Sequence, residues 1–115
     1  MTGVDTYWES AGGKITLLEL LEHTSEEVVM DPKMFESLLP KVDRKEERIS
    51  NADLSYPIIV TVHSGEYKYV LDGQHRLIKA IRDNKTVKVR SLDFNTMPKK
   101  IKDIFSWSLE TVGYN

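Results

Sequence analysis

A change of hydrophobic period in the second half of the chain constrains the fold most. Residues 57–71 are rich in β-branched and aromatic side chains, and Ser64-Gly65 in their middle suits a tight turn. Helical spacing of apolar residues begins directly after Gly73 and continues over residues 74–83, and a two-residue alternation returns over residues 87–94. The sequence therefore predicts a hairpin, a helix and a further strand of one mixed sheet.

Signals outside this region predict further helices. Thr16 and Glu19 have the spacing of a capping box, and Asp31-Pro32 places an N-cap acceptor before a proline whose φ suits a helix start. Residues 96–115 are expected to contain a C-terminal helix, because their apolar residues recur at helical spacing. Residues 1–13 carry glycines without a steady period, so we expect them to form a flexible arm.

Length and composition favour one domain over residues 1–115. The chain has 40% hydrophobic and 30% charged residues, so we expect a globular α+β fold with a small mixed β-sheet and packed helices. The net charge of -2 gives no global positive field to attract nucleic acid or an anionic membrane. The absence of cysteine excludes disulfides and thiolate chemistry and fits a cytoplasmic protein, and no apolar segment is long enough to span a bilayer.

The turn at residues 72–76, Asp-Gly-Gln-His-Arg, is the strongest candidate for a site. The first amides of a helix have no intrahelical partner, and the helix end contributes about 0.3–1 kcal/mol toward a bound anion. A helix that begins at Gln74 places its apolar residues on one arc and its ionic residues, including Arg76 and Lys79, on the other. This pattern predicts a phosphate site at the helix start, with Arg76 as a charged donor.

Residues 67–80, with the strand at residues 57–60, resemble the ParB-like box of strand, D-G-x-H-R motif and helix in the ParB/sulfiredoxin-like superfamily. The resemblance covers about residues 54–94. In that superfamily the box binds nucleotide phosphates: CTP in chromosome-partition proteins, ATP in sulfiredoxin and ADP in the free serine kinases. The motif is closest to the kinases' form, so the resemblance implies a nucleotide ligand.

The resemblance also implies roles for single residues. Asp72 would orient the turn or approach a Mg²⁺ ion that retains several waters, and Asp72 and His75 are the candidates for catalysis. A purely structural alternative is that Asp72 caps the helix, His75 is exposed and Arg76 pairs with a carboxylate. The residues expected at the nucleotide phosphates are Gly73, Gln74, His75, Arg76 and Lys79.

The chain departs from the superfamily in three respects. It lacks the cysteine that sulfiredoxin chemistry needs, and the residues after Phe94 are too few for the DNA reader and dimerisation domain of partition proteins. The free serine kinases also use an N-terminal glutamate as base, but no flanking motif of this chain fixes its position, and Glu19 and Glu22 are the nearest candidates.

The mixed charges at residues 43–48 predict a solvated face, with a ligand-facing basic strip as the alternative.

Three functions fit these observations. The first is nucleotide binding, with Mg²⁺-dependent kinase or NTPase activity as an extension. The second is a nucleic-acid-binding or nuclease-like module in which His75, Arg76, Lys79 and Arg82 contact a sugar-phosphate backbone. The third is a small regulatory adaptor, of phage or mobile-element type, that works through Trp107 and Tyr114 of the C-terminal helix. The preferred base, the acceptor and the oligomeric state stay open.

Overall fold

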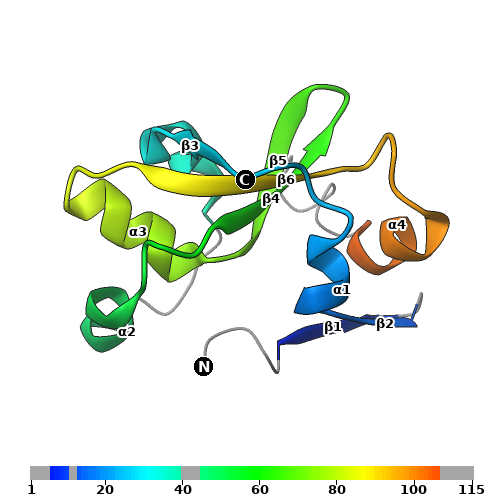
Figure 1. The fold of residues 1–115 in the computed structure, drawn as a ribbon, viewed down its shortest axis with the longest axis horizontal. Coiled ribbons are helices and arrows are strands. Elements are labelled where there is room, and N and C mark those ends of the chain that lie inside the picture. The colour runs from blue at the N-terminus through cyan, green and yellow to red at the C-terminus, as the bar shows by residue number, and fades with distance from the viewer. Residues whose placement is uncertain (1–5, 11–12, 40–44, 107–115) are drawn as a thin grey trace.

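The centre of the fold is a four-stranded sheet in the order β3-β6-β4-β5 (Figure 1). The computed structural model describes residues 6–10, 13–39 and 45–106. The central strands β4 and β6 are parallel, and the other neighbours are antiparallel, so the sheet is mixed, as the sequence predicts. The strands are β3 (Val28–Met30), β4 (Ile58–His63), β5 (Glu66–Asp72) and β6 (Val87–Asp93).

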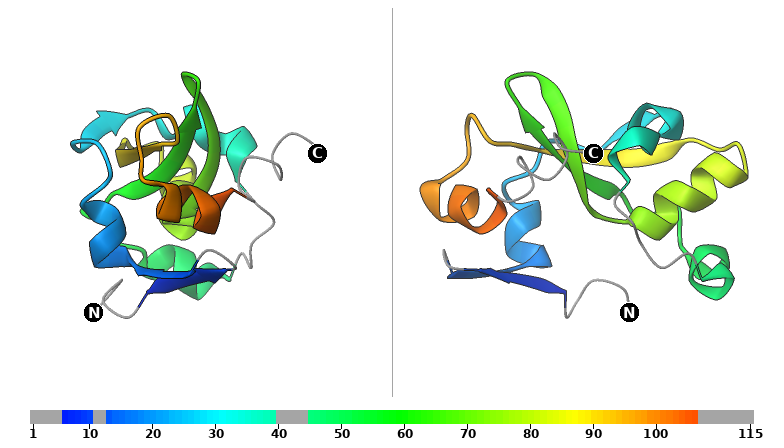
Figure 2. Two further views of the ribbon diagram at one scale, coloured as in Figure 1. Left: turned by 90° about the vertical axis from the view of Figure 1, so that its right-hand side faces the viewer. Right: turned by 180° about the vertical axis from the view of Figure 1, so that it is seen from behind.

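Helices and a second small sheet cover both faces of this sheet (Figure 2). The helical elements are α1 (Leu17–Leu21), the 3₁₀ helix η1 (Pro32–Leu38), α2 (Glu46–Asn51), α3 (Gln74–Arg82) and α4 (Lys99–Phe105). The second sheet is an antiparallel hairpin of β1 (Tyr7–Ser10) and β2 (Gly13–Thr16). The described residues thus form an α+β fold.

Two apolar clusters lie on opposite faces of the sheet. Ile58 belongs to the cluster that contains Phe35 of η1 and Leu77 of α3, whereas its neighbour Ile59 belongs to the cluster that contains Phe105 of α4. Alternate residues of β4 therefore point into different cores. This double burial explains why β4 begins with three successive apolar residues, Ile58–Val60, rather than with an alternation.

The predicted hairpin, helix and strand of residues 57–94 are confirmed. Ser64 and Gly65 both have positive φ, at 51° and 81°, which is the geometry that a tight two-residue hairpin requires. The capping box of Thr16 and Glu19 is present at the start of α1. Asp31 caps η1 as expected, although that helix is 3₁₀ rather than α.

The expected flexible arm at residues 1–13 is wrong for Tyr7–Ser10, which form strand β1. Trp8 packs edge-on against Phe105 of α4, with ring centroids 5.5 Å apart. The hairpin is therefore held by a contact with the far end of the chain, which no local pattern reveals. Strand β3 was not predicted either, because three residues are too few to show a period.

The predicted C-terminal helix is confirmed for Lys99–Phe105. The rest of the predicted span, with Trp107 and Tyr114, lies outside the described residues. Over the described ranges, every helix is too short or too polar to cross a bilayer.

Candidate functional site

The turn between β5 and α3 depends on Gly73. This residue is the N-cap of α3 and has φ 89° and ψ 24°, in the left-handed region that favours glycine. A Cβ at Gly73 would lie 2.7 Å from Cγ2 and 3.1 Å from Cα of Ile58. Glycine therefore allows β4 to lie directly against the turn, in addition to giving the turn its backbone conformation.

The start of α3 carries no side-chain cap among the described residues. The amide of Leu77 is bonded to the carbonyl of Gly73, so the amides of Gln74 and Arg76 before it have no acceptor within the helix. These amides and the positive end of the helix dipole point toward the turn. Asp72 is thus not the helix cap that the structural alternative proposes.

A pocket of about 590 Å³ lies in front of this turn. One wall is formed by residues 72–76, and the facing wall comes from the end of the segment before α2, from α2 itself and from the loop after it. The pocket therefore joins two regions that are far apart in the sequence. The residues of the second wall are Lys45, Glu47, Arg48, Asn51, Ala52 and Asp53.

Arg76 is held firmly at the wall of the pocket. Its Nη1 donates a hydrogen bond to the carbonyl of Pro57 at 3.0 Å and lies 3.4 Å from Oδ2 of Asp72. The guanidinium carbon lies 5.6 Å from the ring centroid of Tyr56. Only 13% of the Arg76 side chain is exposed. The predicted pairing of Arg76 with a carboxylate is therefore present, and it fixes the guanidinium beside the turn.

The other motif side chains point in different directions. His75 lines the pocket, whereas Nε2 of Gln74 donates a hydrogen bond of 2.8 Å back to the carbonyl of Val70. Lys79 is not part of the pocket wall. Its Nζ donates hydrogen bonds of 2.8 and 3.0 Å to the carbonyls of Ser50 and Ala52 at the end of α2. Lys79 thus holds α2 in place, a different role from the predicted contact with phosphate.

The segment around α2 is the part of the site that sequence reasoning missed. Arg82 of α3 forms an ion pair with Glu46, and this pair and the Lys79 contacts attach α2 to α3. Lys45 and Arg48 then face the turn across the pocket. The predicted solvated face is confirmed for residues 45–48, which are all exposed, while residues 43 and 44 lie outside the described part. The alternative of a ligand-facing basic strip stays a prediction, although Lys45 and Arg48 line the pocket.

Asp53 adds a charged carboxylate to the pocket. Its Oδ1 accepts hydrogen bonds from the hydroxyl of Ser55 at 2.6 Å and from the amide of Ser55 at 2.9 Å. The hydroxyl bond, followed by the amide bond and the charges of Arg76 and Lys79, lowers the pKa of Asp53 below its ordinary value. The charged residues of the lining are the cations Lys45, Arg48 and Arg76 and the anions Glu47, Asp53 and Asp72.

The expected metal site at Asp72 has no ready-made set of protein ligands. Within residues 6–10, 13–39 and 45–106, no three histidine or carboxylate side chains lie close enough together to hold a metal ion. A Mg²⁺ ion at Asp72 would therefore take most of its oxygens from water and from a bound phosphate, which is its usual coordination at nucleotides. Glu19 and Glu22, the candidate bases, do not line the pocket.

A scan against protein-family models and searches of curated proteins and of solved structures find no match to this chain. The resemblance to the ParB/sulfiredoxin-like superfamily stays a prediction. It is carried by the motif at residues 72–76 and by the strand, turn and helix in which the motif lies.

Proposed function

We propose that the pocket at the start of α3 binds the phosphates of a nucleoside di- or triphosphate, such as ATP, ADP or CTP. One observation carries the proposal: the uncapped first turn of α3 opens into the same pocket as Lys45 and Arg48 of the facing wall. Helix amides and cationic side chains both bind phosphate in proteins, and here both line one pocket. Arg76, fixed at the pocket wall, adds a third cation.

We also propose that Mg²⁺ accompanies the nucleotide. Among the described residues, the lining has three cations and three carboxylates, so they supply little excess positive charge to offset a di- or triphosphate. Asp72 lies directly beside the turn, where an anion and a carboxylate would repel each other without a cation between them. A hydrated Mg²⁺ between Asp72 and the phosphates would remove that repulsion.

Phosphoryl transfer or NTP hydrolysis is an extension of this proposal. Asp72 and His75 line the pocket and would be the residues closest to the phosphates, and Arg76 would steady the transferred group. The candidate bases Glu19 and Glu22 do not lie at the pocket. Binding is therefore the part that the geometry supports best.

A thermal-shift panel of ATP, ADP, CTP and GTP, with and without Mg²⁺, tests the proposal. A ligand that binds the native state raises its stability with the logarithm of saturation, so at least one nucleotide should raise the melting temperature in a saturable way. Arg48→Ala should weaken this effect. Arg90→Ala is the matched control, because Arg90 contacts Thr24 and Ser25 away from the pocket. A panel in which no nucleotide raises the melting temperature would overturn the proposal.

The variant Asp72→Asn tests whether Mg²⁺ accompanies the nucleotide. Asparagine keeps the size of the side chain and removes the charge that attracts Mg²⁺. We expect nucleotide affinity to fall in Mg²⁺ and to change little in EDTA. A variant with unchanged affinity in both conditions would remove Mg²⁺ from the proposal and leave Asp72 as the ion-pair partner of Arg76.

The contacts of α3 argue against the nucleic-acid alternative. Lys79 and Arg82, two of its four proposed contacts to a sugar-phosphate backbone, are bonded to α2. Salt titration separates the two functions, because binding to a nucleic-acid backbone weakens steeply as counterions are released. A single nucleotide in the pocket should show a shallower salt dependence. The adaptor hypothesis depends on Trp107 and Tyr114, outside the described residues.

A further inference from the structure

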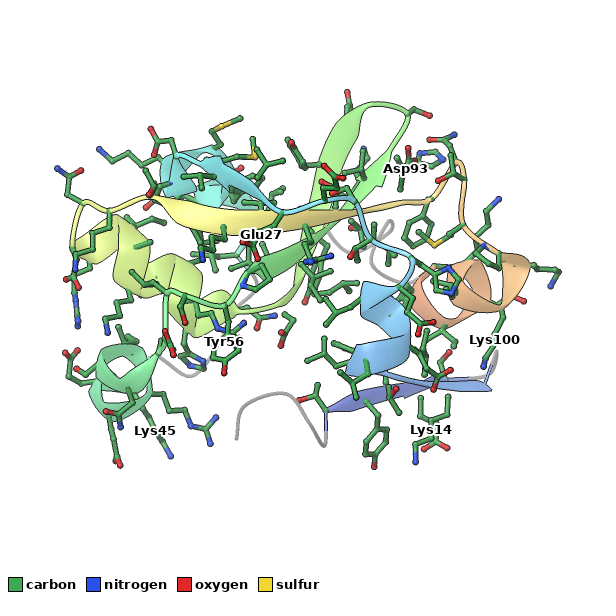
Figure 3. The ribbon with its side chains drawn as sticks, viewed as in Figure 1. Lys14, Glu27, Lys45, Tyr56, Asp93 and Lys100 are labelled. Carbon is green, nitrogen blue, oxygen red and sulfur yellow. The ribbon has the colours of Figure 1, made fainter. Side chains whose placement is uncertain are left out.

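An exposed aromatic ring lies beside Arg76, a residue of the pocket wall, although the ring itself is not part of that wall. Tyr56 belongs to the loop between α2 and β4, and 43% of its surface is exposed. Its ring lies against the guanidinium of Arg76, and the next residue, Pro57, provides the carbonyl that accepts a hydrogen bond from Arg76. Figure 3 shows Tyr56 beside the first turn of α3. The ring therefore contacts one residue of the proposed phosphate site, and the guanidinium of that residue, Arg76, supports one side of it.

Tyr56 differs from the two tyrosines of β5. Tyr67 packs edge-on against Phe35, with ring centroids 4.9 Å apart, and Tyr69 packs against the core on the other face of the sheet. Tyr56 is a member of neither core cluster. Burial in the core therefore does not explain its position, and its ring offers apolar area beside the pocket.

The loop that carries Tyr56 is held in a defined conformation. The amide of Tyr56 donates a hydrogen bond of 3.2 Å to the carbonyl of Asp53, whose carboxylate accepts the two bonds from Ser55. Lys79 fixes the carbonyl of Ala52 just before this turn. A loop that is already ordered loses little entropy when it binds a ligand, which favours a role in recognition.

The charges of the pocket set the direction of the ligand. Phosphates would be attracted to the first turn of α3, Lys45 and Arg48. The carboxylate of Asp53 would repel them, as would those of Glu47 and Asp72, but Asp72 is paired with Arg76. A ribose can instead donate hydrogen bonds from its hydroxyl groups to that carboxylate. The uncharged half of a nucleotide would therefore lie on the side of Asp53 and Tyr56.

We propose that Tyr56 is the stacking surface for the base of the bound nucleotide, with Asp53 beside it as the acceptor for the ribose hydroxyls. The inference rests on the proposed function and adds the nucleoside half of the ligand to it. Stacking on an aromatic ring tolerates every base. The pocket should therefore distinguish nucleotides from inorganic pyrophosphate more strongly than it distinguishes one base from another.

Titration calorimetry with the full chain tests the inference, using ATP and inorganic pyrophosphate in the presence of Mg²⁺. Tyr56→Ala should lower the affinity for ATP about tenfold, as expected for loss of one stacked base, and should leave the affinity for pyrophosphate unchanged. Tyr56→Phe should retain most of the affinity for ATP. Tyr7→Ala is the matched control, because Tyr7 is an exposed ring with Lys14 over it in the distant β1-β2 hairpin.

Each result has a distinct meaning once thermal melting has verified that the variants fold. Equal losses of affinity for ATP and for pyrophosphate in Tyr56→Ala would overturn the inference, since the ring would then act only through Arg76. Unchanged ATP affinity in that variant would also overturn it. Equal affinities of the wild-type protein for ATP and pyrophosphate would support the phosphate site and contradict the proposed base site. Wild-type protein that binds neither would overturn the proposed function as well.

Discussion

Single side chains at the β5-α3 turn serve the fold and the site together. Gly73 lets β4 lie against the turn. Arg76 donates a hydrogen bond to the carbonyl of Pro57, just before β4, and contacts the ring of Tyr56 and the carboxylate of Asp72. The sequence motif indicates that these residues matter. It does not indicate that part of their role is to fix the turn before any ligand arrives.

Gly73→Ala should destabilise the protein more than Gly65→Ala. Both glycines have positive φ, which costs about 1–3 kcal/mol for another residue. At Gly73 the new Cβ would also overlap the side chain and backbone of Ile58, whereas nothing lies within 4 Å of a Cβ at Gly65. Urea denaturation of the two variants measures the difference. Equal losses of unfolding free energy would show that β4 can move away from the turn.

Ser55→Ala should raise the pKa of Asp53 toward its ordinary value, because it removes the hydroxyl bond that lowers the pKa most. A lowered pKa means that the bond stabilises the fold above the pKa of the unfolded chain and that this contribution is lost as pH falls through the folded pKa. A carboxyl-carbon NMR titration of both proteins measures the shift. An unchanged pKa would assign the lowering to the amide of Ser55 and to the nearby cations.

At the scale of elements, local patterns predicted the hairpin, α3, β6 and the first wall of the pocket. They did so because turn chemistry at Ser64-Gly65 and the change of period at Gly73 are encoded within a few residues. The second wall depends on the docking of α2 by Lys79 and Arg82, which is a contact between distant segments. Such contacts leave no periodic signal, and the mixed charges at residues 43–48 indicate only a solvated face, so α2 itself was not predicted.

Lys79→Ala should loosen α2 more than it destabilises the whole fold. The variant loses two hydrogen bonds to the end of α2, and the expected cost is about 1 kcal/mol. Hydrogen exchange of the amides in Glu46–Asn51 should become faster, while exchange in β4 should stay slow. Lys85→Ala, an exposed lysine beyond the end of α3, is the control. Unchanged exchange in α2 would show that its apolar contacts hold it without Lys79.

At the scale of the whole molecule, the four-stranded sheet and its two cores support the pocket, which lies at one end of the sheet. The net charge of -2 offers no general attraction for anions, so the proposed phosphate binding would have to come from local geometry at the start of α3. Lys45 and Arg48, from a distant segment, line the same pocket as that turn and supply the local positive charge on which the proposal relies.

An amide NMR titration of the full chain with pyrophosphate and Mg²⁺ is the most direct test. The account predicts saturable shifts that are largest for the amides of Gly73, Gln74 and Arg76, with smaller shifts near Arg48, because the first turn of α3 would donate to the anion. Absence of saturable shifts at this turn, or shifts spread over the lysines of α4, would contradict it.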